Sequence, residues 1–145
     1  MKADFENVMY RLNCMTADLG SLYHQAALKL GMSDSVLFLL YLVYAKGGRC
    51  SLSEIRRATN ISKQTLNSAI RKLEKDGTLY LEPNGGRTKD VCLTEAGKHY
   101  ADSTIARLFC AEFHAFHTWT PEEVEQYLNL MEKYNRDFRT QIEKM

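Results

Sequence analysis

The chain has 145 residues, 45% of them hydrophobic, and a formal net charge of +1 at pH 7. This length suits one domain with a real core and is short for an enzyme with two lobes. No run of about 18 apolar residues occurs, which argues against a membrane span, and the N-terminus lacks the apolar stretch of a secretory signal. We therefore expect a cytoplasmic protein whose four cysteines are reduced thiols.

Two helices are predicted before residue 47. Apolar residues recur at three- and four-residue steps over 5–30, which predicts one long amphipathic helix that ends near Gly31. Ser33 is expected to cap a second helix over 34–46, which is apolar nearly all round and should be buried. The glycine pair at 47–48 ends that helix.

A helix-turn-helix follows. Ser51 and Glu54 have the spacing of a capping box and predict a short helix. One face of this helix is expected to be buried, through Leu52, Ile55 and Ala58. After a break at Asn60, Ser62 caps a longer helix that Gly77 ends. Its apolar stripe consists of Leu66, Ile70 and Leu73.

The opposite face of the longer helix is polar and cationic. It carries side chains that can reach base edges or phosphates, with no acid before Glu74. These residues are Lys63, Gln64, Thr65, Asn67, Ser68, Arg71 and Lys72. This pattern predicts a helix that enters the DNA major groove.

A hairpin is predicted next, with strands at 78–81 and 91–93 and a turn at 83–86. Arg87 and Lys89 lie just past its tip, where they can reach phosphate or a minor groove. A solvated basic hairpin alone carries little information, but after a polar-faced helix it predicts a DNA-binding wing.

The charges are unevenly distributed. Residues 46–89 hold ten Lys or Arg and four acids, a net of +6, while the rest of the chain carries −5. A basic module in an acidic frame is typical of a localised DNA-binding surface.

The C-terminal region is also predicted to be helical. Thr94 and Glu95 open one helix that continues to Phe116, and a capping box at 120–123 opens a last helix with an apolar seam up to residue 142. A small winged module cannot cover two long seams, one at each end of the chain. Packing of the first helix against the last is the alternative, but we expect a homodimer on a palindromic site.

Several motifs resemble the MarR (multiple-antibiotic-resistance regulator) family of bacterial transcription factors. The most specific pieces are Leu73-Glu74-Lys75-x-Gly77 and Leu93-Thr94-Glu95-x-Gly97. Family proteins commonly carry Asp-x-Arg in the wing. Here Arg87 matches the Arg, while Gly85 stands where the Asp would be.

The resemblance covers about residues 5–142 and implies a mainly α fold with a small β-wing. Residues 1–145 would form a single MarR-type domain, with dimerisation helices at 1–31 and 95–145 and a winged helix-turn-helix at 33–94. The implied function is a homodimeric regulator, in our interpretation a repressor, often released from double-stranded DNA by a small ligand, a metal or an oxidant. We expect base contacts from Gln64, Thr65, Asn67 and Ser68, with Ser62 at the helix start. Phosphate contacts are expected from Arg56, Arg57, Lys63, Arg71, Lys72, Arg87 and Lys89.

The inducing signal stays open. Oxidant-sensing members use a cysteine on the first helix, but we expect Cys14 to be a packed thiol. Cys110, His114 and His117, with His24 or His99, have metal-ligand chemistry at helical spacing, yet interleaved phenylalanines favour packing, so no metal or cofactor is assigned. Aromatic residues that could line a ligand cleft are Tyr23, Phe38, Tyr41 and Phe113.

The sequence is less consistent with two other functions. A winged helix can bind proteins instead of nucleic acid, but such a surface usually exposes apolar anchors, unlike the face at 63–72. An enzyme is not expected, because the chain has no Gly-rich phosphate loop, nucleophile elbow or convincing carboxylate pair.

Overall fold

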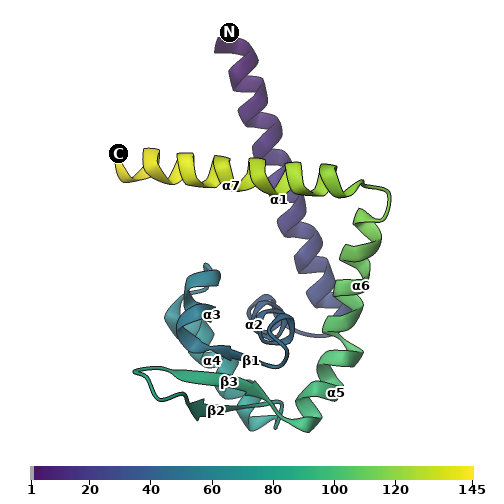
Figure 1. Ribbon diagram of the computed structural model, residues 1–145, viewed down its shortest axis with the longest axis vertical. Coiled ribbons are helices and arrows are strands. Elements are labelled where there is room, and N and C mark those ends of the chain that lie inside the picture. Colours follow the sequence, from purple (N-terminus) through teal and green to yellow (C-terminus); the bar gives the residue numbers. More distant parts are fainter. Residues whose placement is uncertain (1) are drawn as a thin grey trace. The chain divides into compact units, whose positions relative to one another are not determined.

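The computed structural model describes residues 2–145, with side chains from residue 4 onward. It divides into two compact units, Met1–Leu108 and Phe109–Met145. The elements, labelled in Figure 1, are α1 (Lys2–Leu30), α2 (Asp34–Ala45), β1 (Arg49–Ser51), α3 (Leu52–Ala58), α4 (Lys63–Lys75), β2 (Leu79–Pro83), β3 (Lys89–Leu93), α5 (Glu95–Ser103), α6 (Ile105–Phe116) and α7 (Pro121–Glu143).

The predicted helix caps are confirmed. The hydroxyls of Ser33, Ser62, Thr94 and Thr120 each accept a hydrogen bond from the backbone N–H three residues on, as N-cap side chains do. Gly77 has the left-handed conformation expected of a residue that ends a helix, with φ of 74°.

The sheet of the first unit has three antiparallel strands in the order β1-β3-β2. The prediction of a two-stranded hairpin was therefore incomplete, because it missed β1. Arg49 of β1 pairs with Cys92 of β3, which is far away in sequence. A three-residue strand is too short to show an alternating pattern, so its sequence gives no signal.

The core of the first unit is built around α2. Leu37, Leu39, Leu40 and Val43 are fully buried, together with residues from α3, α4, β3 and α6. The prediction that α2 is buried is confirmed for these residues and for Val36, but Phe38 is 39% exposed. One face of α2 lines a cavity that is described below.

No described helix is by itself long and apolar enough to span a membrane. Taken together, α1 and α2 have the required length and composition, but they are bent by 89° at the break between them. The shorter of the two is the buried helix of this core.

The short helix α3 differs from its prediction in two details. Ile55 is buried as expected, but Ala58 is exposed. Ser51 accepts from the Glu54 N–H at 3.2 Å, whereas the Glu54 carboxylate pairs with Lys46 Nζ at 2.7 Å and does not close a capping box. A cation close in space thus competes with the local capping interaction.

The single helix predicted from Thr94 to Phe116 is broken at Thr104, which separates α5 from α6. The hydroxyls of Ser103 and Thr104 donate to the Tyr100 carbonyl at 2.9 and 2.6 Å. In a continuous helix that carbonyl would accept the Thr104 N–H, which bonds to Ala101 instead, at 3.2 Å. Side-chain bonding to the backbone therefore accompanies the break.

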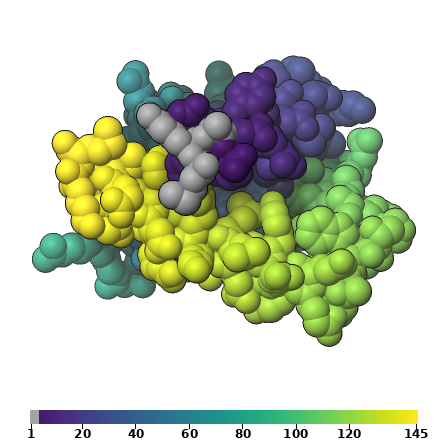
Figure 2. All heavy atoms as spheres, turned by 90° about the horizontal axis from the view of Figure 1, so that it is seen from above, coloured from purple at the N-terminus to yellow at the C-terminus, as the bar shows by residue number. Residues whose placement is uncertain are grey.

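The second unit consists of the end of α6 and α7. Phe116 and Tyr127 each pack edge to face with Trp119 at the turn between these helices, with ring centroids 4.9 and 5.5 Å apart, and their own rings are tilted at 6.4 Å. A complete capping box, Thr120 with Glu123, starts α7. No residue of α7 is buried, and its side chains, yellow-green to yellow in Figure 2, lie at the surface of that view.

Candidate nucleic-acid interface

One side of α4 is fixed in the core, which determines what the other side presents. Leu66, Ala69, Ile70 and Leu73 are buried. Ser62 starts the helix by accepting from the Thr65 N–H at 3.2 Å. With this stripe in the core, the remaining positions of α4 must face outward.

The outward face of α4 contains the residues predicted for DNA contact. Asn67 is half-buried. The exposed residues are Lys63, Gln64, Thr65, Ser68, Arg71 and Lys72. Among the described residues, none of the three cations on this face forms an ion pair. Their charges are therefore available to phosphate.

The hydroxyls and amides of this face differ in their partners. The Ser68 hydroxyl donates to the Gln64 carbonyl at 3.0 Å, and the Thr65 hydroxyl accepts from Ser62 at 2.8 Å. Within the described part of the chain, the Gln64 and Asn67 side-chain amides have no hydrogen bond. An amide can form two hydrogen bonds with an adenine edge, so these two residues are the stronger candidates for base contact.

Arg56 and Arg57 lie at the end of α3 and are exposed. Arg57 lies close enough to Glu54 to contribute to lowering the pKa of that carboxyl, an effect that comes first from the hydrogen bond and charge of Lys46.

The wing is the hairpin of β2 and β3, whose loop extends from the helical part of the first unit in Figure 1. The strands pair from Leu79 with Leu93 to Pro83 with Lys89. Arg87 and Lys89 are exposed, and no ion pair of either is seen within residues 4–145. The wing thus presents two exposed cations beside the loop.

Two of the cations that were counted in the basic segment 46–89 form ion pairs with acids of the same unit. Lys46 pairs with Glu54, and Arg49 binds Asp90 at 2.5 Å and Glu82 at 2.7 Å. The hydrogen bonds from Asn84 and then Arg49 hold the pKa of Asp90 below its usual value. Sequence reasoning missed this cluster, because residues 33 and 41 positions apart give no local signal.

A close junction joins the wing to α5. Thr94 Oγ1 accepts from the Gly97 N–H at 2.9 Å and donates to the Gly77 carbonyl at 2.5 Å. A Cβ at Gly97 would lie 1.8 Å from the Thr78 carbonyl oxygen. The Leu-Thr-x-x-Gly motif therefore encodes an N-cap and a contact that only glycine permits.

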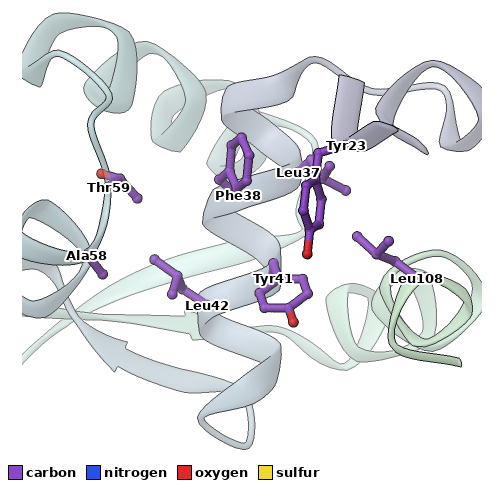
Figure 3. Close-up of a pocket in the computed structure, with 8 residues that line it drawn as sticks. All are labelled: Tyr23, Leu37, Phe38, Tyr41, Leu42, Ala58, Thr59 and Leu108. Carbon is purple, nitrogen blue, oxygen red and sulfur yellow. The ribbon is translucent and has the colours of Figure 1, made fainter. Parts of the chain in front are cut away.

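A separate cavity of about 190 Å³ opens beside α2 in the first unit. Figure 3 shows its lining: Tyr23 from α1, Leu37, Phe38, Tyr41 and Leu42 from α2, Ala58 and Thr59 from the end of α3, and Leu108 from α6. The Tyr23 and Phe38 rings are 6.0 Å apart. Three of the four aromatic residues considered from the sequence thus line one cavity, while Phe113 is 72% exposed and does not contribute.

The candidate metal ligands are not brought together. His114 Nδ1 is bonded to the Cys110 carbonyl and His117 Nδ1 to the His114 carbonyl, each at 2.7 Å. His24 pairs with Asp34 at 2.8 Å. No three His, Cys, Asp or Glu side chains among the described residues form a group suited to a metal.

The cysteines fall into two classes. Cys50 and Cys92 are buried, and burial raises the pKa of Cys50 to about 11. Cys14 and Cys110 are exposed free thiols, so the expectation of a packed Cys14 was wrong for the single chain.

The fold and this surface define a winged helix-turn-helix protein. A sequence model of the MarR family matches residues 30–88, which extend from the end of α1 into the wing. Over this segment the chain is similar to the MarR family of transcription regulators.

Solved structures of MarR regulators share the fold. A MarR family regulator from Neisseria meningitidis has a TM-score of 0.85 at 15% identity, covering 94% of this chain and 96% of that one. A transcriptional regulator of the MarR family from Silicibacter pomeroyi has a TM-score of 0.69 at 22% identity, covering 87% and 86%. An organohalide-sensing regulator, solved with 2,4-dichlorophenol bound, has a TM-score of 0.60 at 15% identity, covering 91% and 80%. No curated protein matches the sequence.

Proposed function

We propose that this protein is a cytoplasmic transcriptional repressor that binds a palindromic DNA operator as a homodimer. The observation that carries the proposal is the outward face of α4, where, among the described residues, the cations form no ion pair and the amides of Gln64 and Asn67 form no hydrogen bond. The opposite face is held in the core, so the polar face is fixed in orientation. Such a helix is suited to the major groove.

In this proposal, contacts divide into those that specify a sequence and those that position the protein. Gln64 and Asn67 contact base edges, while Thr65 and Ser68 contribute if their hydroxyls exchange partners. The cations bind phosphate: Arg56, Arg57, Lys63, Arg71, Lys72, Arg87 and Lys89.

The dimer is inferred from apolar side chains that are exposed on both terminal helices. On α1, Phe5, Val8, Met15, Leu19 and Leu22 are exposed. On α7, Tyr127, Leu128, Met131, Tyr134, Phe138 and Ile142 are exposed. We assign residues 1–31 and 95–145 to dimerisation and 33–94 to DNA binding, because a second copy would bury both seams and pair two recognition helices.

Release by a small aromatic molecule is the form of regulation that we propose. The cavity between α1, α2, α3 and α6 is lined by aromatic and aliphatic side chains, and its wall includes the end of α3 in the helix-turn-helix. A protein of this fold has been solved with 2,4-dichlorophenol bound. A ligand that favours a different placement of α3 would shift the population that is able to bind DNA.

DNA binding is tested by fluorescence anisotropy on duplexes from the region upstream of the protein's own gene, against a scrambled duplex, at two salt concentrations. Asn67→Ala should cost about 1–3 kcal/mol per subunit on the cognate duplex and much less on the scrambled one. Lys72→Ala should weaken binding to both and lower the salt slope by about one per subunit.

Two results would contradict the proposal. The first is the absence of binding to any upstream fragment at low salt. The second is an equal loss by the Asn67 and Lys72 variants on both duplexes, which would refute the assignment of base contacts. Adding 2,4-dichlorophenol, zinc or peroxide to the same assay tests release, and only the aromatic compound should lower affinity.

A further inference from the structure

Asp90 lies at the centre of a hydrogen-bonded cluster that joins the sheet to the tip of the wing. It is in β3, where it pairs with Ser51 of β1 on one side and Glu82 of β2 on the other. Its side chain is only 15% exposed, and one carboxylate oxygen accepts from Arg49 Nε at 2.5 Å. The carboxylate is thus held by a strand outside the hairpin.

The other carboxylate oxygen of Asp90 holds the turn. Asn84 Nδ2 donates to it at 2.9 Å, and Asn84 Oδ1 accepts from the Gly86 N–H at 3.0 Å. Gly85, between them, has φ of 82°, a conformation that favours glycine. The Asn84 side chain therefore bonds both Asp90 and the Gly86 backbone, which holds residues 84–86 in place immediately before Arg87.

The turn has no acid of its own between Pro83 and Lys89. The anchoring charge comes instead from Asp90, within the strand that follows. Because Arg49 belongs to β1, the position of the tip is tied to the body of the first unit and not only to the hairpin.

We propose that Asp90, acting through Asn84 and held by Arg49, positions the wing tip so that Arg87 can contact DNA. This inference rests on the proposed DNA-binding function. Asp90 and Asn84 are positioning residues, which need not touch the nucleic acid themselves. They fix the backbone at Arg87 before DNA binds, so that less conformational entropy is lost when the arginine contacts the DNA.

The charge of Asp90 makes the proposal easy to test, because two effects have opposite signs. A carboxylate near the DNA repels phosphate, so removing it should strengthen binding if charge is all that matters. Loss of the positioning cluster should weaken binding. Glu82 supplies a matched control, since it also binds Arg49 and faces Asp90 across the strands but does not hold Asn84.

The experiment compares wild-type protein with Asp90→Ala, Asn84→Ala and Glu82→Gln on the tightest upstream duplex. We expect Asp90→Ala and Asn84→Ala to weaken binding roughly 3- to 10-fold and to lower the salt slope by up to about one per subunit. Glu82→Gln should bind as well as wild type or more tightly. Tighter or unchanged binding by Asp90→Ala would overturn the proposal.

A double-mutant cycle tests the link to Arg87 directly. Arg87→Ala should cost clearly less in the Asn84→Ala background than in wild type, because the arginine there is no longer positioned. Equal costs in both backgrounds would overturn the proposal. Asn84 lies in an exposed loop and its substitution changes no charge, so this variant keeps the test valid even if Asp90→Ala fails to fold.

Hydrogen exchange provides a readout that needs no DNA. In Asn84→Ala and Asp90→Ala the Gly86 amide should exchange faster, while amides in the β2–β3 ladder near Leu79 and Leu93 keep their protection. Unchanged exchange at Gly86 would refute the cluster. Wild-type protein that binds no duplex would refute the proposed function instead, so the two failures are distinguishable.

Discussion

Gly97→Ala should be strongly destabilising, although alanine is the better helix former. The new Cβ would lie 1.8 Å from the Thr78 carbonyl oxygen and 2.8 Å from its carbon, whereas ordinary contact begins at 3.4 Å. Backbone atoms cannot rotate away as a flexible side chain can, so α5 and the start of β2 must separate by about 1.6 Å.

That separation would break the junction between the wing and α5. The Thr94 N–H bond to the Thr78 carbonyl, 3.1 Å long, and the Thr94 hydroxyl bond to Gly77 would both be lost. Each bond contributes about 0.5–1.5 kcal/mol, and the overpacking itself costs about 1–3 kcal/mol. We expect a loss of about 2–6 kcal/mol in the free energy of unfolding, measured by urea denaturation at fixed protein concentration.

Gly20→Ala is the matched control. Gly20 is exposed within α1, and a Cβ there would meet no atom of the described residues of the same chain within 4 Å. This substitution should stabilise the protein by roughly 0.5–1 kcal/mol through helix propensity. If Gly97→Ala proves as harmless as Gly20→Ala, the steric reasoning is wrong.

Three further outcomes are expected. Iodoacetamide at pH 8 should leave Cys50 and Cys92 unlabelled until urea unfolds the protein, because both thiols are buried and burial raises the pKa of each. Detection of either thiol in alkylated form by mass spectrometry of the native protein would contradict this. Ser62→Ala should cost about 1 kcal/mol of unfolding free energy through loss of the α4 cap, while Ser68→Ala, whose hydroxyl bonds only a helix carbonyl, should be near neutral in the same urea titration. Asp90 has a lowered pKa in the folded state, so the stability contributed by its charge is present above the ordinary aspartate pKa and is lost as pH falls through the lower folded pKa. The difference in unfolding free energy between wild type and Asp90→Asn should therefore narrow from pH 7 to pH 3. A difference that stays constant over this range would argue against a role for the charge.

The sequence by itself determined the features that depend on neighbours within about four residues. Caps at Ser33, Ser62 and Thr120 were predictable because an N-cap hydroxyl bonds a backbone N–H three residues away. The two faces of α4 followed from the helical period, which separates Leu66 and Ile70 from Gln64. The winged order of elements and the MarR family resemblance rested on the same local patterns.

Only the tertiary structure decided which distant residues meet. Strand β1, the cluster of Arg49 with Asp90, and the cavity that joins Tyr23 to Thr59 depend on contacts between segments far apart in the chain. The ion pairs of Lys46 and Arg49 also depend on the fold. A count of charges along the sequence assigns both cations to the DNA surface, but in the structure each is paired with an acid. Local propensity does not encode these pairings, because burial and strand register are properties of the packed chain as a whole.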